Sequence, residues 1–426
     1  MRRGAHALKA PRWRTALVGL LVVGVIVGLL VAWRSSTGGS SATPGRSARA
    51  SRASGANGAD PTSPTTPTTG VSTAGTGANT PTTAAANGHG VATTATTTKP
   101  AAAAGTSTTI PPGPLAPGIV IASAIFDLPD PYLLDVGGTY YMYVSTPFGA
   151  TYLNAAVIHG RPGAWSAPTD ILPNLPPWAV KQFTWTPAVY PFGNQYVMYF
   201  SSVPVAWPSM HCIGVAVSTS PVGPFSPNPN PLVCHPEHGG DIDAQLFVDS
   251  AGPNGPAHPN YLIWKTDNNS TPGKGPPEFW AQPVSDDGLT MTGQPTPIYW
   301  PRQPWQNNLL EAPQMVKDPY GRLWLFYSGG GIFNMPSYAM GFAACDSPMG
   351  PCHDTTNVPI LASNQQGVGP GEETVFVGPD GSTWLLYNPW YAGQMFNWVR
   401  PAEAARIVWS RSGPSLGIPA GPFPPP

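Results

Sequence analysis

Short apolar runs alternate with Pro- and Gly-rich turns from about residue 117 onward. An aromatic run of six residues occurs five times, at YYMYVS (140–145), YVMYFS (196–201), YLIWKT (261–266), LWLFYS (323–328) and TWLLYN (383–388). A second apolar run precedes each one, at 131–135, 187–191, 244–249, 313–318 and 374–380. Runs of this length, bounded by turn residues and rich in aromatic and β-branched side chains, are typical of β-strands. The pattern predicts five hairpins in an all-β domain.

The hairpins recur at a regular spacing. The aromatic runs start 56, 65, 62 and 60 residues apart, and IGVAVSTSPVGPF (213–225) shares six of 13 residues with MGFAACDSPMGPC (340–352). The offset of that second pair, 127 residues, equals two of the spacings (65 and 62). A repeat of roughly 60 residues with about four strands is typical of a β-propeller blade. We predict a five-bladed β-propeller over 117–413 and a Pro-rich tail over 414–426. In the alternative, a β-sandwich, the repeat would be a coincidence.

The N-terminal region has a different character. Residues 1–15 are basic, and residues 16–33 form an uncharged, mostly apolar run between Arg14 and Arg34. Eighteen residues of helix span about 27 Å, close to the thickness of a hydrocarbon core. We predict a transmembrane signal-anchor over 16–33, with 1–15 in the cytoplasm and the propeller outside it. A cleaved signal peptide and a secreted domain are the alternative.

Composition and charge narrow the function classes. Residues 34–116 are dominated by Ser, Thr, Ala, Gly and Pro, with no aromatic residue over 35–117, which predicts a disordered linker. From residue 115 onward, 20 acidic residues face 10 Lys and Arg, so a nucleic-acid partner is not expected. The four cysteines lie in the part predicted to be exported, where disulfides persist. Three pairings exist, of which we expect the local ones, Cys212–Cys234 and Cys345–Cys352.

Acidic residues recur at one place in the repeat. The first strand of each propeller blade lines the central channel, so residues at the start of these strands meet at the axis. The residues just before the predicted first strands are Asp130, Thr186, Asp243, Glu311 and Glu372-Glu373. Clustered carboxylates repel one another, but glycoside hydrolysis needs one protonated carboxyl group and one ionised one. The pattern predicts a glycosidase, with Asp127 as an alternative to Asp130.

The same segments resemble glycoside hydrolase family 43, a group of five-bladed propellers that includes arabinanases and xylosidases. The matching pieces are Asp130-Pro131, Trp185-Thr186-Pro187, IGVAVSTSPVGPF, Ile242-Asp243 and Glu311-Ala312-Pro313. The resemblance implies an inverting enzyme in which Asp130 is the general base, Glu311 is the general acid and Asp243 tunes and orients the acid. It also implies substrates that contain arabinose or xylose. Inversion requires the two catalytic carboxyl groups to lie roughly 6.5–9.5 Å apart.

Two positions depart from the family. Glu372 stands where the family usually has a His that often helps to hold a metal, and Ala312 replaces the usual Gly. No cofactor is expected to be required, and a structural Ca²⁺ is the ion that Glu372 would suit. The altered fifth blade keeps open a second hypothesis, a monomeric cell-surface propeller that binds glycans without cutting them. Fructan-acting propellers of families 32 and 68 are disfavoured, because their Arg-Asp-Pro signature is missing.

Three further groups of residues remain. Trp185 is the expected sugar-stacking residue because it adjoins an axial position. Arg406 in the last blade is expected either to contact a sugar hydroxyl or to form a structural ion pair. His235, Glu237 and His238 are expected to form a surface loop rather than a metal site. The domain is expected to act on a polysaccharide or oligosaccharide as a monomer.

Overall fold

The computed structural model describes residues 119–122, 127–147, 153–249, 260–271, 273–333, 335–364, 367–378, 380–391 and 400–417. All of them lie in Pro100–Pro426, the second of two compact units of the chain. The predicted anchor over 16–33 and linker over 34–116 lie outside the described residues. Within those residues, each helix is a single 3₁₀ turn, and none has the length and apolar character needed to cross a membrane.

The described residues form five antiparallel sheets. The first contains β2 (Tyr132–Val136), β3 (Thr139–Val144), β4 (Ala156–Arg161), β5 (Ala164–Trp165) and β6 (Thr169–Asp170). The second contains β7 (Ala179–Phe192), β8 (Gln195–Pro204), β9 (Cys212–Ser218) and β10 (Ser226–Pro227). The third contains β11 (Asp241–Val248), β12 (Asn260–Thr266), β13 (Phe279–Val284) and β14 (Thr296–Tyr299). The fourth contains β15 (Leu310–Lys317), β16 (Leu323–Gly329), β17 (Ala339–Cys345) and β18 (Cys352–Asp354). The fifth contains β19 (Gly367–Val377), β20 (Thr383–Tyr391), β21 (Ala402–Ser410), β22 (Gly413–Gly417) and β1 (Ile119–Ala122).

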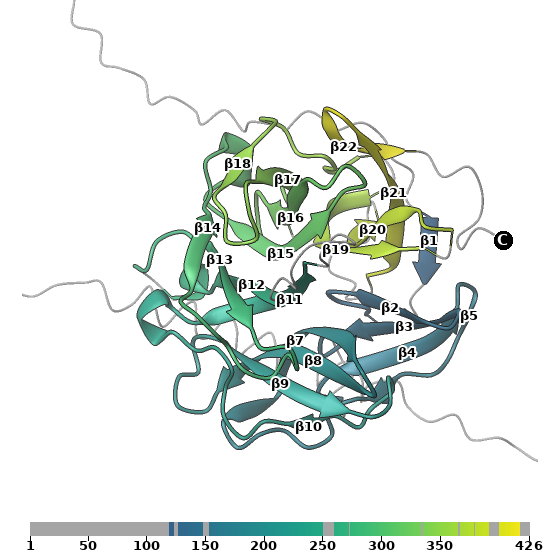
Figure 1. Ribbon diagram of the computed structural model, residues 1–426, viewed down its shortest axis with the longest axis vertical. Coiled ribbons are helices and arrows are strands. Elements are labelled where there is room, and N and C mark those ends of the chain that lie inside the picture. Colours follow the sequence, from purple (N-terminus) through teal and green to yellow (C-terminus); the bar gives the residue numbers. More distant parts are fainter. Residues whose placement is uncertain are drawn as a thin grey trace, which may run out of the picture. The chain divides into compact units, whose positions relative to one another are not determined.

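The five sheets are the blades of a propeller, as predicted. The first strands β2, β7, β11, β15 and β19 surround the centre (Figure 1), and each pairs with the strand that carries one of the five aromatic runs. These second strands are apolar over most of their length, rather than alternating between apolar and polar residues, because both of their faces are covered. In β16, for example, all seven residues are buried. A continuous apolar run is typical of a strand that is buried on both sides.

Packing between blades closes the ring. Five apolar clusters each join two neighbouring sheets. The last of them around the ring joins the fifth blade to the first. In that last cluster, Trp384 and Leu386 of β20 pack with Met142 and Val144 of β3. Each blade therefore contributes apolar side chains to two cores at once.

Both ends of the described chain complete the same blade. Strand β1 pairs with β21 through Ile119↔Ala404, and β22 pairs with the remainder of the same edge of β21. The backbone N–H of Leu128 also donates to the carbonyl of Arg400 at 3.3 Å. Such closure covers a sheet edge that would otherwise be free to pair with another chain.

Both predicted disulfides are present. Cys345 and Cys352 face each other across β17 and β18 and are bonded. Cys212, at the start of β9, is bonded to Cys234, which directly follows a bridge between Ile213 and Val233. Each bond ties a blade's third strand to the segment that returns beside it.

Candidate active site

One residue per blade adopts the same unusual backbone conformation at the axis. These residues have φ between 50° and 60°, in the left-handed region, and they are Asp130, Thr186, Asp243, Ala312 and Glu372. Four of them lie at a bulge inside the first strand, where the register shifts, rather than before the strand as the sequence predicted. A bulge redirects one side chain and is over-represented beside active sites.

The backbone N–H at this position is held by the neighbouring blade. The N–H groups of Thr186, Asp243 and Glu372 donate to serine hydroxyls at 2.7, 3.1 and 3.0 Å, and that of Asp130 donates to Asn388 Oδ1 at 3.0 Å. The acceptors each end the aromatic run of the preceding blade: Ser145, Ser201, Ser328 and Asn388. The small polar residue that closes each run therefore fixes the axial backbone of the next blade.

The fourth blade breaks this pattern. Thr266 closes the aromatic run of the third blade, but its hydroxyl bonds to the backbone of Glu278. The N–H of Ala312 donates instead to the carboxylate Oδ2 of Asp243, at 3.0 Å. Asp243 thus holds the backbone next to Glu311. This contact gives a physical basis for an orienting role of Asp243.

Glu311 lies one residue before the axial position that the sequence pattern assigned to it. The axial position of the fourth blade is Ala312, so Glu311 does not correspond to Asp130 or Asp243. Its Oε1 accepts a hydrogen bond from the Lys265 ammonium at 3.2 Å, and its Oε2 contacts the Tyr338 hydroxyl at 2.9 Å. The Lys265 side chain is buried, and the Glu311 side chain is 14% exposed. The offset leaves Glu311 beside a cation that no other axial carboxylate contacts directly in the described residues.

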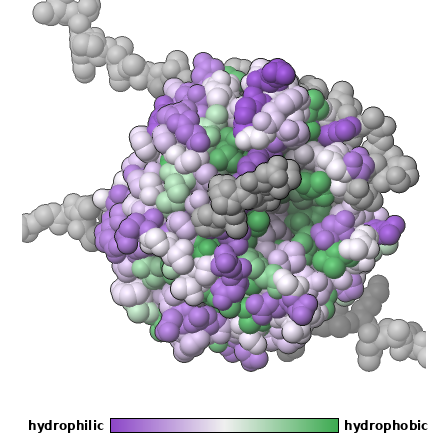
Figure 2. Space-filling view, in the orientation of Figure 1, coloured by the Kyte–Doolittle hydropathy of each residue, from purple (hydrophilic) through white to green (hydrophobic). Residues whose placement is uncertain are grey.

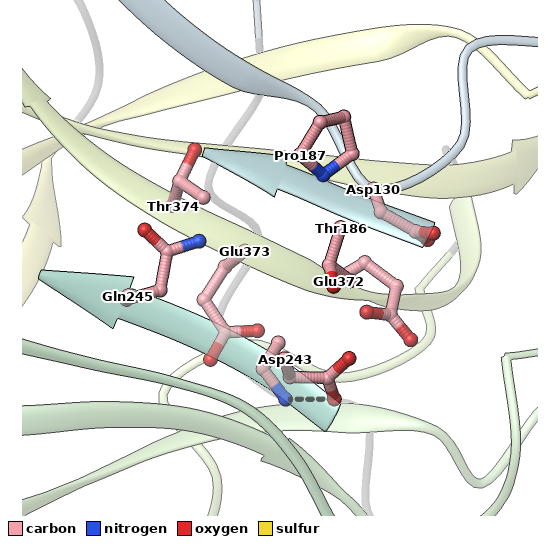
Figure 3. Close-up of a pocket in the computed structure, with 9 residues that line it drawn as sticks. Asp130, Thr186, Pro187, Asp243, Gln245, Glu372, Glu373 and Thr374 are labelled. Carbon is pink, nitrogen blue, oxygen red and sulfur yellow. Dashed lines mark hydrogen bonds between the residues drawn. The ribbon is translucent and has the colours of Figure 1, made fainter. Parts of the chain in front are cut away.

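A pocket opens at the centre of the propeller. Four of the five predicted axial positions contribute to its lining, and in the fourth blade Ala312 lines the pocket in place of Glu311. The lining residues are Asp130, Thr186, Pro187, Asp243, Gln245, Ala312, Glu372, Glu373 and Thr374. Figure 3 shows the carboxyl groups of Asp130, Asp243 and Glu372 toward one side of this pocket. Glu373, Gln245 and Thr374 lie toward the other side. The structure therefore brings acidic residues from three distant parts of the chain to one site.

Burial makes these carboxyl groups hold protons more tightly than usual. It raises the pKa of Asp130, an effect partly offset by the charge of Arg400. It raises the pKa of Asp243 to about 7, with Lys265 opposing the rise and Glu311 adding to it. An acid whose pKa lies near neutrality can exist in either protonation state at the operating pH, which suits acid–base chemistry.

The two glutamates of the fifth blade are affected more strongly. Burial raises the pKa of Glu372 well above its ordinary value, and the charges of Asp130, Glu311 and Asp243 add to the rise. Burial raises the pKa of Glu373 to about 8, although the Ser328 hydroxyl donates to its carboxyl group. Glu373 therefore keeps its proton near neutral pH, and Glu372 holds its proton more tightly than an exposed glutamate does. The site carries fewer negative charges than its composition suggests.

Asp127, the alternative to Asp130, forms a buried ion pair with Arg400. Its two carboxylate oxygens bind the Arg400 guanidinium at 3.0 and 2.9 Å, and one also accepts the Arg400 backbone N–H at 2.9 Å. Both side chains are buried. Arg400 Nη1 lies 3.9 Å from Asp130 Oδ1, so the same guanidinium faces the axial carboxylate. This geometry favours Asp130 over Asp127 as the residue that meets a substrate.

Trp185 lies on β7 directly before the axial Thr186. Its ring is 4.4 Å from that of His211, centroid to centroid, and the residue is 37% exposed. Phe183 and Trp207 are also exposed. On the face in Figure 2, polar and apolar side chains are interspersed around the ring. Trp185 is not among the residues that line the pocket, but an exposed aromatic ring next in sequence to a lining residue is suited to stacking on sugars.

The other predicted residues lie away from the axis. Arg406 is exposed on the third strand of its blade, β21, opposite Trp384. His235 bonds to Asp241 through Nδ1 at 3.0 Å, and Pro236–His238 form a 3₁₀ turn. In the part of the chain that the structure describes, no group of three or more His, Cys, Asp and Glu residues could hold a metal ion. The axial carboxyl groups, as placed, do not fit a Ca²⁺ site.

Sequence reasoning missed Lys265, Tyr338 and Arg400. Lys265 carried a signal, because it is the single charged residue in the five aromatic runs. Arg400 and Tyr338 carried none, since they come from segments outside the repeated runs. All three reach the site from a second strand or a connection rather than from a first strand.

A five-bladed propeller with carboxyl groups gathered in its axial pocket defines a propeller glycosidase. The family model of glycosyl hydrolases family 43 matches residues 123–414, and the chain belongs to this family. A thermostable family-43 glycoside hydrolase of known structure is 25% identical, with a TM-score of 0.60, over 72% of this chain and 96% of that one.

Other solved structures share the fold. An endo-1,4-beta-xylanase from Bacteroides thetaiotaomicron is 23% identical, with a TM-score of 0.56, over 68% of this chain and 94% of that one. An alpha-L-arabinofuranosidase from Lactobacillus brevis is 19% identical, with a TM-score of 0.56, over 70% of this chain and 95% of that one. No curated protein matches the sequence significantly.

Proposed function

We propose that the chain is an inverting glycosidase that cleaves arabinose- or xylose-containing polysaccharides outside the cytoplasm. The observation that carries the proposal is that Asp130 and Asp243 line the axial pocket, while Glu311 lies outside that lining but close enough for its charge to raise the pKa of both. Asp130 faces Arg400, Glu311 faces Lys265, and Asp243 holds the backbone beside Glu311. Paired carboxyl groups with distinct environments are what acid and base roles require.

The reaction uses two of these groups directly. Asp130 takes a proton from a water molecule, whose oxygen attacks the anomeric carbon, while Glu311 protonates the leaving oxygen on the opposite side. The guanidinium of Arg400 stabilises Asp130 in its ionised form before the reaction. Asp243 orients Glu311 through Ala312, and its own charge state depends on Lys265 and Glu311.

The substrate class and the location rest on separate support. The related structures include an arabinofuranosidase and a xylanase, and Trp185 offers an exposed ring directly before Thr186, which lines the pocket. The apolar segment at 16–33 and the two disulfides support a membrane-anchored domain outside the cytoplasm. We propose that the domain works as a monomer. Glu372, in place of the family's usual His, favours glycan binding without cleavage as the second candidate.

The experiment that separates the two candidates is a hydrolysis assay of the full-length protein. Arabinans, xylans and chromogenic pentosides are incubated with wild type, with Glu311→Gln and with Glu237→Gln, which makes the same change at an exposed glutamate outside the pocket. Hydrolysis by wild type and by Glu237→Gln, with a loss of at least about 100-fold in Glu311→Gln, supports the enzyme. Equal absence of hydrolysis in all three, with retained glycan binding, establishes the binding propeller instead.

A further inference from the structure

A tyrosine links the proposed acid to the glutamate that distinguishes this chain. The Tyr338 hydroxyl lies 2.9 Å from Glu311 Oε2 and 2.7 Å from Glu372 Oε1. Tyr338 directly precedes β17, and its backbone N–H donates to the carbonyl of Met335 at 3.0 Å. Tyr338 is 1% exposed and Glu372 is 9% exposed. The three groups form one short, buried chain of hydrogen bonds.

The number of protons in this chain can be counted. A tyrosine hydroxyl has one proton and can donate it to only one carboxylate at a time. The second short contact then joins two oxygens without a proton between them, unless one of the carboxyl groups is itself protonated. Two unprotonated oxygens at such a distance repel each other. The geometry therefore requires one further proton, on Glu311 or on Glu372.

The surroundings place that proton on Glu372. The Lys265 ammonium pairs with the ionised form of Glu311, whereas Glu372 has no ion-pair partner among the described residues. The titratable and charged groups that face the chain from the surrounding elements are Asp130, Asp243, Glu373, Lys265 and Arg400. Three of these five are carboxyl groups, which favour a neutral Glu372. Arg400 is already bound to Asp127.

This arrangement leaves the proposed acid without its own proton in the resting site. Glu311 beside Lys265 is stabilised as a carboxylate, yet general-acid catalysis requires it to deliver a proton. Tyr338 connects it to Glu372, a carboxyl group that can hold one. These two observations suggest that one glutamate, Glu372, holds the proton and the other, Glu311, delivers it.

We propose that Glu372 stores the proton that Glu311 delivers and passes it through the Tyr338 hydroxyl. This inference rests on the proposed function. The proton of Glu372 moves to Tyr338 Oη as the Tyr338 proton moves to Glu311 Oε2, and Glu311 then protonates the leaving oxygen as the glycosidic bond breaks. Asp130 accepts a proton from the attacking water. Exchange with solvent returns that proton from Asp130 to Glu372. Tyr338 and Glu372 act through Glu311 and are positioning residues.

The leaving group of the substrate provides the test. A dinitrophenyl leaving group departs without protonation, whereas an alkyl leaving group needs the acid. The full-length protein and the variants Glu372→Gln and Tyr338→Phe are assayed on both glycosides of the pentose that wild type hydrolyses. We expect kcat/KM to fall about 100-fold or more on the alkyl glycoside and less than about tenfold on the dinitrophenyl glycoside. The basic limb of the pH profile on the alkyl glycoside should also move to lower pH in Glu372→Gln.

A second tyrosine–glutamate pair supplies the matched control. Tyr387 and Glu403 form a hydrogen bond of 3.1 Å on β20 and β21, outside the pocket lining. Tyr387→Phe and Glu403→Gln should leave the ratio of the two activities unchanged. That ratio is measured within one variant, so a partly folded preparation does not alter it.

The outcomes separate the relay from the function. If Glu372→Gln and Tyr338→Phe reduce both activities equally, or reduce neither, the relay is wrong while the hydrolase stands. If wild type hydrolyses neither glycoside nor any polysaccharide in the panel, the proposed function fails and the relay fails with it. Selective loss on the alkyl glycoside supports both.

Discussion

Asp243 combines a structural hydrogen bond with an electrostatic role, and two substitutions separate them. Its Oδ2 accepts the Ala312 N–H at 3.0 Å, in the blade where no serine or asparagine side chain takes that place. Asparagine keeps an oxygen that can accept this bond but removes the charge. Alanine removes both. We therefore expect Asp243→Asn and Asp243→Ala to differ in stability but not in their loss of catalysis.

The size of the difference follows from burial. Asp243 and Ala312 are 5% and 8% exposed, so the N–H has little access to water once its acceptor is gone. A buried donor without a partner costs about 1–3 kcal/mol. Asp243→Ala should be less stable than Asp243→Asn by that amount. Ser201→Ala, which removes the equivalent acceptor of the Asp243 N–H, should cost a similar amount relative to wild type.

Catalysis should fall in both variants. Without a negative charge beside Glu311 and Lys265, the proton balance of the site changes, and the loss of kcat/KM should be about 100-fold or more. Urea unfolding gives the stabilities, and hydrolysis of the panel's best substrate gives the activities. The reasoning is refuted if Asp243→Asn is as unstable as Asp243→Ala, or if Asp243→Asn retains wild-type kcat/KM.

Three further predictions concern other parts of the molecule. Asp127→Ala removes both hydrogen bonds from a carboxylate to the buried Arg400 guanidinium and should cost about 3–5 kcal/mol in urea unfolding, whereas Lys317→Ala, at the more exposed pair with Asp249, should cost less than about 1 kcal/mol. Equal costs would contradict this account. The pKa of Glu373 is raised from its ordinary value of 4.5 to about 8 in the folded state. Between pH 4.5 and about pH 8, the folded state therefore binds more protons than the unfolded state. Stability should therefore fall as pH rises through this window, and Glu373→Gln should flatten the slope by up to about 1.4 kcal/mol per pH unit; an unchanged slope argues against it. Trp185→Ala should raise KM for oligosaccharides about tenfold with little change in kcat, and an unchanged KM excludes sugar stacking there.

Much of the fold was predictable because the second strand of every blade has both faces buried. That burial demands continuous aromatic and aliphatic runs, which are visible in the sequence at a fixed spacing. The local disulfides were predictable because each links residues close in sequence. The closed ring was expected of a five-bladed propeller, but the pairing of β1 with β21 of the last blade was not predicted, since β1 is a strand of four residues with no partner near it in sequence.

The site was predictable only in part. Asp130, Asp243 and Glu372 were found because they share one place in the repeat, which the fold converts into a shared place in space. Glu311 was placed one residue out of register, because the left-handed conformation falls on Ala312 and leaves no mark in the pattern of acidic residues. Small polar residues end all five aromatic runs, a repeated signal that could have indicated how the axial backbone is held.

The stereochemistry of the first product tests the central claim most directly. Proton NMR during the first minutes of hydrolysis distinguishes the anomers before they interconvert. The account predicts that the newly formed reducing sugar has the anomeric configuration opposite to that of the substrate, since Asp130 directs water to the face away from Glu311. A product that retains the configuration of the substrate would contradict the assignment of Asp130 as a general base.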